Sequence, residues 1–356
     1  MSALRTSSPL LIIGNPDLIH MGAHLMHAAR SLGIAAEIVD TGAAFAAPRL
    51  LVALSWRLRG HRPPRLKAFG RAVAERCRAL RPLALLATGL APLNAATMQL
   101  IGQMGVPRLT FLTDDPWNAA HTAPWFMGTL AAYDLVCSPR RANLSALERA
   151  GCRQVAYLPF AYNPSVHFAE PPATAAERER FDCDLLFAGG ADADRLPVMS
   201  ALIRAGFNLA LYGGYWERDP MTRPFARGHA DPALLRKAVG GARVALCLVR
   251  RANRDGHVMR SYELPAMGAC MLTEDTLEHR ELFGAEGEAT LYFCTTEMLL
   301  EKLRWLLANP AERTRLASAA HSRIVAGANT YADRLRAVLE LTGLAGHGPR
   351  RFEPTL

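Results

Sequence analysis

Two successive runs of short apolar segments, each alternating with longer segments of helical periodicity, limit the possible folds of this chain more than any other feature. This alternation is typical of βαβ units and parallel sheets. The first half has expected strands at residues 9–13, 34–39, 83–88, 107–112, 134–138 and 154–158. The second half has them at 183–188, 209–212, 242–249 and 269–272. Helical patterns cover residues 21–32, 196–205, 234–239, 262–267 and 331–341, and a further helix is expected to begin at Pro310.

A proline-rich stretch at residues 159–179 separates the two runs, and no hydrophobic period survives in it. A chain of 356 residues, half of them apolar, is long enough for two buried cores. We therefore expect two doubly wound α/β domains. The predicted division is an N-terminal domain at 1–165, a linker at 166–180, a C-terminal domain at 181–329, a terminal helix at 330–343 that packs back on the N-terminal domain, and a flexible tail at 344–356.

The bulk composition limits the partners and the compartment. A net charge of +9 suits anionic ligands such as nucleotides, acidic glycans or lipid headgroups. The seven cysteines are odd in number and form no CxxC pair, so neither a disulfide framework nor a zinc site is indicated. The N-terminal apolar run is too short for a signal peptide, and no run is long enough to span a bilayer. We expect a cytoplasmic protein.

The strongest local signal is the segment 255–269, in which Asp255 precedes Glu263 by eight positions. Pro265 is tolerated best in the first turn of a helix, so the helix is predicted to begin near Tyr262. Its N–H groups would then lie beside Glu263 and could bind a diphosphate. Glu263 could accept both ribose hydroxyls, and Arg260 could neutralise phosphate charge. The alternative is a surface loop that leads into an ordinary helix.

A pair of glycines, Gly189 and Gly190, follows the first strand of the second half and precedes Arg195. Glycines after a strand allow a ligand to approach the backbone closely. A second pair, Gly213 and Gly214, follows the next strand. Two such pairs indicate a binding edge, although a plain strand-to-helix turn remains open.

Two adjacent acids, Asp114 and Asp115, follow the fourth strand and precede Pro116. Either carboxylate could act as general base toward an acceptor hydroxyl or orient the acceptor. The alternative is a cap of Asx type before the proline. Side chains of neighbouring residues in an extended segment point in opposite directions, so we do not expect a metal site here.

The loop after the first strand contains His20 and is flanked by Gly14 and Gly22, and we assign these three residues to the acceptor side. His20, His24 and His27 share one face at helical spacing. That spacing could bind a metal. Histidines on a polar face are the alternative that we favour.

The segment from Arg49 to Arg81 holds ten Lys and Arg residues but one acid, Glu75. Leucines and Trp56 accompany its first part. The pattern fits a solvated helical face, a membrane-surface element or a contact with another anion. No basic-aromatic nucleic-acid module is present, so nucleic acid is not expected as a partner.

The run from Arg260 to Leu272 resembles the C-terminal signature of glycosyltransferases related to the spore maturation protein CgeB. Further similarity lies at Phe187–Gly190, at Leu211–Gly213, at Thr113–Pro116 and in the closing Thr330–Arg334. These enzymes are similar to the larger group of retaining GT-B glycosyltransferases that carry an acid-x7-Glu motif. The resemblance implies the GT-B fold, in which two Rossmann-like domains face a central cleft.

The same resemblance implies a function: transfer of a hexose from a UDP- or GDP-type nucleotide-sugar to a glycan, lipid-linked or protein acceptor, with retention, without metal and without a permanently bound cofactor. It implies that Glu263 holds the ribose, Arg195 the diphosphate and Asp255 the donor sugar, where the family usually has Glu. The expected donor-binding residues are Gly189, Gly190, Arg195, Tyr212, Gly213, His229, Arg260, Glu263 and Gly268. The expected catalytic residues are Asp114, Asp115 and Asp255. A catalytically silent nucleotide-sugar-binding homologue and a nucleotide-sugar epimerase of the same fold remain alternatives.

Overall fold

The computed structural model describes residues 8–344, and the chain divides into two compact units. Of the described residues, unit 1 comprises 8–159, 252–255 and 331–344. Unit 2 comprises 160–251 and 256–330. The chain therefore returns to unit 1 for four residues, 252–255, in the middle of unit 2. The tail expected at 344–356 lies outside the described residues except for its first position.

Unit 1 is built on a six-stranded parallel sheet with the order β2-β1-β3-β4-β5-β6. The strands are β1 (Leu10–Gly14), β2 (Ala36–Asp40), β3 (Ala84–Thr88), β4 (Arg108–Phe111), β5 (Leu135–Ser138) and β6 (Val155–Tyr157). The chain order reverses between β1 and β3, and ligands of open α/β sheets bind beyond the carboxyl ends of the strands at such a point.

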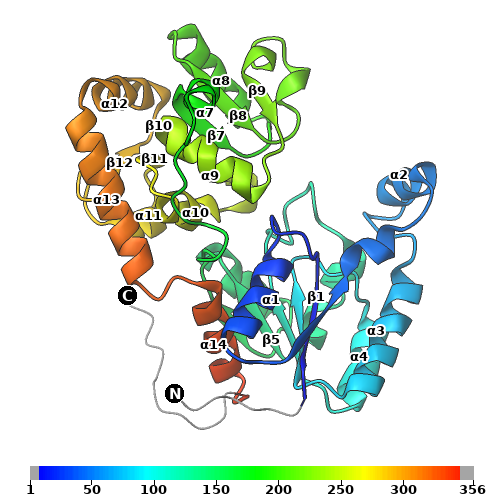
Figure 1. Cartoon of the computed structure of the whole chain (residues 1–356). Helices are drawn as coiled ribbons and strands as arrows, with labels where there is room; N and C mark the ends of the chain where they lie inside the picture. The colour runs from blue at the N-terminus through cyan, green and yellow to red at the C-terminus, as the bar shows by residue number, and fades with distance from the viewer. Residues whose placement is uncertain (1–7, 345–356) are drawn as a thin grey trace. The chain divides into compact units, whose positions relative to one another are not determined.

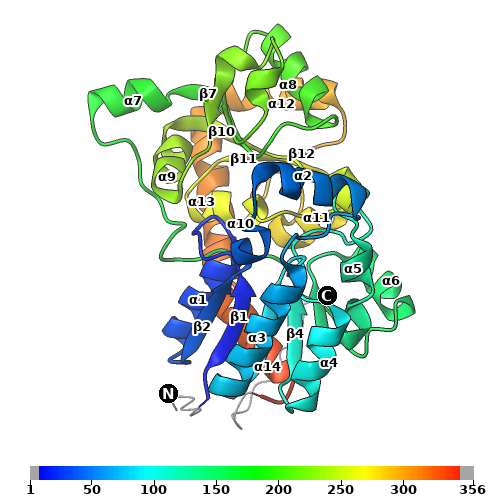
Figure 2. The same ribbon diagram turned by 90° about the vertical axis from the view of Figure 1, so that its right-hand side faces the viewer.

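Helices cover both faces of this sheet (Figures 1 and 2). Helix α1 packs against α14 on one face, while α3 and α4 bury apolar side chains against strands β1 and β3 on the other. The helices of unit 1 are α1 (Met21–Ser31), α2 (Arg49–Leu58), α3 (Leu66–Leu80), α4 (Ala95–Gln103), α5 (Pro124–Met127), α6 (Leu144–Arg149) and α14 (Tyr331–Leu341). Short 3-10 turns lie at Thr41–Phe45, Leu130–Ala132 and Arg141–Asn143.

Unit 2 contains a second six-stranded parallel sheet, with the order β12-β11-β10-β7-β8-β9. Its strands are β7 (Cys183–Ala188), β8 (Leu209–Tyr212), β9 (Ala226–Gly228), β10 (Ala242–Cys247), β11 (Met271–Glu274) and β12 (Leu291–Phe293). Numbered within the unit, this is the order of a dinucleotide-binding Rossmann sheet, and its reversal point lies between β7 and β10.

The core of unit 2 lies between the sheet and helices α8 and α12, whose apolar side chains meet those of β7, β8 and β10. Helix α9 lies against β7 and β10. The helices of this unit are α7 (Ala175–Phe181), α8 (Arg195–Arg204), α9 (Pro232–Gly241), α10 (Arg260–Ala266), α11 (Leu277–Phe283), α12 (Thr296–Ala308) and α13 (Pro310–Ala326). Short 3-10 turns lie at Trp216–Arg218, Arg223–Phe225 and Arg251–Asn253.

Three of the differences between the structure and the sequence expectation have a local physical reason. The proline-rich stretch is not wholly irregular, because a capping box of Thr174 and Glu177 starts α7 inside it. Helix α10 begins at Arg260, two residues before the predicted start, so Pro265 lies within it. Strand β11 begins at Met271 because Gly268, at φ 85°, ends α10 and the N–H of Ala269 bonds back to the carbonyl of Leu264.

Of the helices in the described part of the chain, none is long and apolar enough to cross a membrane.

Candidate functional site

The loops that follow β7 and β8 are joined to each other next to the reversal point of the unit 2 sheet. The N–H of Gly189 donates to the carbonyl of Tyr212 at 2.8 Å, and the N–H of Ala191 donates to that of Gly214 at 2.9 Å. Gly213 has φ 130°, and a Cβ there would lie 2.4 Å from the carbonyl oxygen of Gly189. Only glycine fits this position, so the two glycine pairs let the loops pack backbone against backbone.

Arg195, the first residue of α8, folds back over this loop. Its Nη1 donates to the carbonyl of Gly190 at 2.9 Å and lies 3.4 Å from the carboxylate of Asp192. The guanidinium stands 5.2 Å from the centre of the Phe187 ring. The side chain is buried and braces the glycine loop; its expected contact with a diphosphate stays a prediction.

Helix α10 brings Glu263 to the same end of the sheet. The Glu263 carboxylate is buried, with 1% of the side chain exposed, and forms an ion pair with Arg260. It also lies 3.7 Å from Nε2 of His167. Arg260 donates from Nε to the carbonyl of Ala188, the last residue of β7, at 3.3 Å. These contacts tie the predicted ribose-binding residue to the strand that carries the glycine loop.

The first N–H groups of α10 already have partners. Those of Tyr262 and Glu263 donate to the carbonyl of Met259, and that of Ser261 donates to the carbonyl of Val258. Because α10 begins earlier than predicted, Glu263 lies at the end of its first turn. The guanidinium of Arg260, whose side chain is 32% exposed, is therefore more accessible to a phosphate than these N–H groups.

A buried serine–histidine pair, which no sequence motif indicates, holds the start of α10. The hydroxyl of Ser261 lies 2.8 Å from Nε2 of His279, and Nδ1 of His279 lies 2.8 Å from the carbonyl of Glu274. Burial lowers the pKa of His279 to about 4, so the ring is neutral at pH 7. Its Nδ1–H then donates to Glu274, and Nε2 accepts from Ser261.

Three further residues of the expected donor set have simpler positions. Tyr212 ends β8 and is buried, which raises the pKa of its phenol. His229 follows β9, is exposed, and its Nε2 would lie 3.5 Å from a Cβ built on Gly214. Gly268 is the left-handed cap that ends α10. Its place in the sequence is explained by helix termination.

In unit 1, the Asp114–Asp115 turn contacts the returning segment 252–255. Asp115 accepts both Nε and Nη2 of Arg254, at 2.6 and 3.0 Å, and the N–H of Trp117 at 3.0 Å. Asp114 accepts from the amide of Asn253 at 3.1 Å. Asp115 is buried, whereas the side chain of Asp114 is 31% exposed. Of the two, Asp114 is therefore the more accessible base.

Asp255 forms a buried ion pair with Arg140, and each side chain is 2% exposed. Arg140 also donates from Nη2 to the carbonyl of Thr113 at 2.8 Å. The carboxylate expected to touch the donor sugar is thus engaged by an arginine of unit 1. No local sequence pattern announces this partner, because the two residues are 115 positions apart.

The residues predicted on the acceptor side divide into two kinds. Gly14 and Gly22 are buried against each other: a Cβ on Gly22 would lie 3.1 Å from Cα of Gly14. His20 precedes α1 as its N-cap residue and is exposed. The expectation of histidines on one polar face is wrong at His24, which is buried and stacks on Tyr331 of α14 at 5.0 Å between ring centres.

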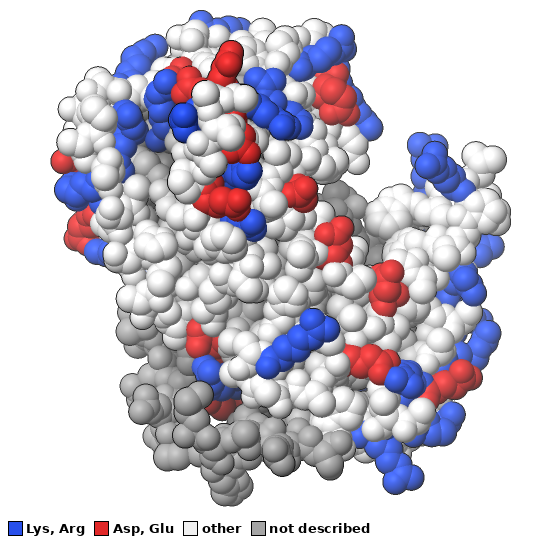
Figure 3. Space-filling view, viewed as in Figure 1, with Lys and Arg blue, Asp and Glu red and all other residues white. Residues whose placement is uncertain are grey.

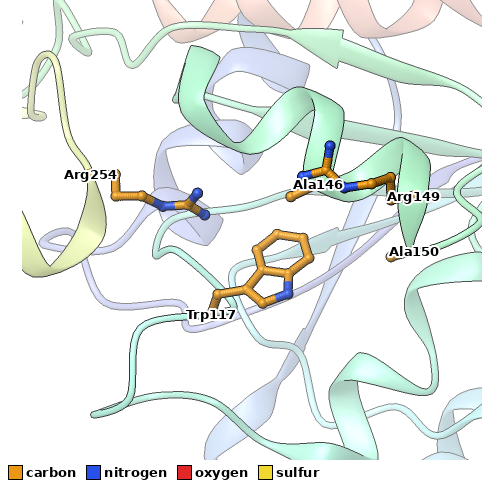
Figure 4. Close-up of a pocket in the computed structure, with 5 residues that line it drawn as sticks. All are labelled: Trp117, Ala146, Arg149, Ala150 and Arg254. Atoms are coloured by element: carbon orange, nitrogen blue, oxygen red, sulfur yellow. The ribbon is translucent and has the colours of Figure 1, made fainter.

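A pocket of about 470 Å³ opens beside the same turn of unit 1. Figure 4 shows its lining, with the guanidinium groups of Arg149 and Arg254 pointing toward one another near the indole of Trp117. Arg254 lies 5.8 Å from the centre of that ring. Its hydrogen bonds to Asp115 raise the pKa of Arg254. The pocket thus presents an aromatic ring beside two guanidinium groups, of which that of Arg254 is paired with Asp115.

Part of the sequence and the fold match those of known proteins. Residues 195–340 match the protein family described as glycosyl transferase-like. That region holds α10 with Arg260 and Glu263, and it begins at Arg195. No curated protein matches the chain at a significant level.

Solved structures resemble the chain over nearly its whole length. Sucrose-phosphate synthase from Thermosynechococcus elongatus superposes with a TM-score of 0.66 at 13% identity, over 95% of this chain and 99% of that one. HepE from Anabaena in complex with UDP-glucose gives 0.58 at 12% identity, over 94% and 99%. A candidate UDP-N-acetylglucosamine 2-epimerase from Listeria monocytogenes gives 0.55 at 17% identity, over 98% and 100%.

The protein therefore has the GT-B fold, and the fold class predicted from the sequence is confirmed. The family match together with these structures supports a GT-B glycosyltransferase at a general level. Identities this low carry the fold and not the substrate.

Proposed function

We propose that the protein is a glycosyltransferase of the retaining, CgeB-like group that moves a hexose from a UDP- or GDP-type nucleotide-sugar without a metal ion. One observation carries the proposal: Arg260 joins Glu263 to the end of β7 beside the Gly189–Gly190 loop. This places a carboxylate and a cation at the reversal point of a Rossmann sheet, where nucleotides bind. The bound UDP-glucose of HepE supports a donor of this class.

In the proposed donor complex, Glu263 accepts hydrogen bonds from the ribose hydroxyls. Arg260 leaves Glu263 and binds the diphosphate. Arg260 and Arg195 then stabilise the negative charge that builds on the departing nucleoside diphosphate. Because Glu263 is buried and paired, donor binding exchanges one partner of its carboxylate for another. An ion pair of this kind keeps the buried charge satisfied while the site is empty.

The acceptor, in this proposal, lies along unit 1 near Asp114 and the pocket lined by Trp117. Asp114 is exposed enough to accept a hydrogen bond from an acceptor hydroxyl and orient it. The acceptor is a glycan, a lipid-linked saccharide or a protein. We further propose that the enzyme works in the cytoplasm, at the inner face of the membrane, in the synthesis of a cell-surface glycan.

Product analysis tests this function. The full chain is incubated with UDP- and GDP-sugars and candidate acceptors, released nucleotide is measured, and NMR gives the anomeric configuration of the product. The proposal predicts nucleoside diphosphate release and a product with the anomeric configuration of the donor. Conversion of the donor into an epimeric nucleotide-sugar, without an acceptor and without net release of nucleotide, would instead favour the epimerase, which the Listeria structure supports as the second candidate.

A catalytically silent homologue is favoured by one observation, the buried Arg140–Asp255 pair. Such a protein would bind a nucleotide-sugar but give neither transfer nor hydrolysis with any donor. A Glu301→Gln variant, exposed on α12, serves as the matched control for Glu263→Gln in these assays.

A further inference from the structure

Helix α2 of unit 1 turns its leucines to solvent. Leu50, Leu51, Leu54 and Leu58 are 84, 54, 54 and 73% exposed. Of the ten residues of α2, Ser55 is the one that is buried, and its hydroxyl donates to the carbonyl of Arg62 at 2.7 Å. This hydrogen bond ties α2 to the segment that follows it.

The exposed leucines form one stripe. Leu50, Leu54 and Leu58 follow one another at intervals of four residues, and Leu51 lies beside them at seven residues from Leu58. Single exposed leucines are common on soluble proteins, whereas a contiguous apolar face marks an interaction site. Elsewhere in the described chain, Leu277 is as exposed as these but stands without apolar neighbours of that kind at its helical spacing.

The charges around this stripe have one sign. No acid occurs between Asp40 and Glu75, and seven cations do: Arg49, Arg57, Arg59, Arg62, Arg65, Lys67 and Arg71. Figure 3 shows blue and white atoms over α2, without red. The exposed arginines at both ends of the helix therefore frame an apolar face with positive charge alone.

We propose that α2 docks on an anionic lipid bilayer, with its leucines in the boundary between headgroups and acyl chains and its arginines on lipid phosphates. An amphipathic helix with a basic rim has the features of such elements. Ten residues span about 15 Å, which is too short a face for the ~800 Å² per partner that a stable protein interface buries. The inference rests on the peripheral location proposed above, and it brings the acceptor side of unit 1 to a lipid-linked saccharide.

Cosedimentation of the full chain with vesicles tests the inference without any glycosyl transfer. Mixed phosphatidylcholine–phosphatidylglycerol vesicles are compared with pure phosphatidylcholine vesicles, at low and high salt. The wild type binds the anionic vesicles, and high salt weakens this binding because it screens the arginines. Failure of the wild type to bind anionic vesicles, or equal binding to both compositions, would overturn the inference.

Two paired variants assign the binding to α2. Leu50→Ser with Leu54→Ser removes apolar area that the bilayer would bury and lowers vesicle affinity about tenfold or more. Arg57→Gln with Arg59→Gln lowers it by a similar factor on anionic vesicles only. Leu277→Ser, on α11, is the matched control and binds like the wild type. Binding that survives both paired variants contradicts the role of α2.

Sedimentation without vesicles tests whether this face is occupied by a second copy of the chain instead of a bilayer. If the stripe pairs two copies of the chain, the wild type is a dimer that the leucine variant converts to a monomer, and this result would replace the bilayer with a second copy. Donor binding in unit 2 is measured in parallel. If the wild type binds the donor but not the vesicles, the docking role of α2 is refuted and the proposed function stands. If it binds the vesicles but no donor, the proposed function is refuted and the docking role stands.

Discussion

The buried pair of Arg140 and Asp255 predicts a large loss of stability when one charge is removed. Asp255→Asn keeps the shape of the side chain but removes the carboxylate charge that pairs with the guanidinium of Arg140. Each side chain is 2% exposed, so water cannot replace the lost carboxylate. Breaking a buried ion pair in this way costs about 3–5 kcal/mol. Since whole proteins are stable by only about 5–15 kcal/mol, the variant should unfold at a much lower denaturant concentration.

Urea unfolding followed by circular dichroism measures this cost. Replacing both partners, as Arg140→Met with Asp255→Leu, removes both charges and should cost less than Asp255→Asn alone, because no buried charge is left unpaired. Glu312→Gln, which breaks an exposed pair with Arg315, is the control and should leave the unfolding midpoint unchanged. If Asp255→Asn behaved like Glu312→Gln, the structural role of the Arg140–Asp255 pair would be refuted.

Three further predictions concern unit 2 and the thiols. Burial lowers the pKa of His279 from 6.5 to about 4, so the unfolded chain binds a proton more readily than the folded chain. The free energy of unfolding is therefore unaffected by this group above pH 6.5 and falls as the pH drops toward 4. The loss amounts to roughly 3 kcal/mol. In His279→Gln, the urea midpoint should fall less between pH 6.5 and pH 4 than in the wild type, and equal slopes would contradict the assignment. Gly213→Ala should lower both stability and nucleotide affinity, because its Cβ would lie 2.4 Å from the carbonyl oxygen of Gly189. The control Gly206→Ala has open space around its Cβ, so it should lower stability through backbone strain but leave nucleotide affinity unchanged. Among the cysteines, Cys294 is exposed whereas burial raises the pKa of Cys137 and Cys247 to about 12, so a maleimide should label Cys294 first in the native protein; rapid labelling of Cys137 would disprove its burial.

Local periodicity predicts ten of the twelve strands in the described residues, most of which are short buried runs, but not β9 and β12. The strand of residues 183–188 was placed at its observed bounds, and the last helix, Tyr331–Leu341, likewise. Helix α7 was missed because the prolines around it hide the period, although Thr174 and Glu177 carry the signal of a capping box. The preference of proline for the first helical turn predicts too late a start for α10, because Pro265 lies inside the helix, which begins at Arg260.

The candidate site also has some features that the sequence predicts and others that it does not. Glycines that follow strands could be predicted, since position after a strand is visible in the sequence. The partners of the acids could not be predicted, because Arg140 lies 115 residues from Asp255 and Asp115 lies 139 from Arg254. The Ser261–His279 contact also depends on how α10 packs beside α11. Such pairings are set by tertiary packing, and they decide which carboxylates are accessible.

Titration calorimetry of the full chain with a panel of UDP- and GDP-sugars tests the central claim most directly. The account predicts that one nucleotide-sugar binds the wild type and Glu301→Gln equally. It predicts that Glu263→Gln, which loses a charge-assisted bond to the ribose, binds at least about tenfold more weakly. If none of the panel bound the wild type, or if Glu263→Gln bound as tightly as the wild type, the assignment of the donor site to α10 and the Gly189–Gly190 loop would be contradicted.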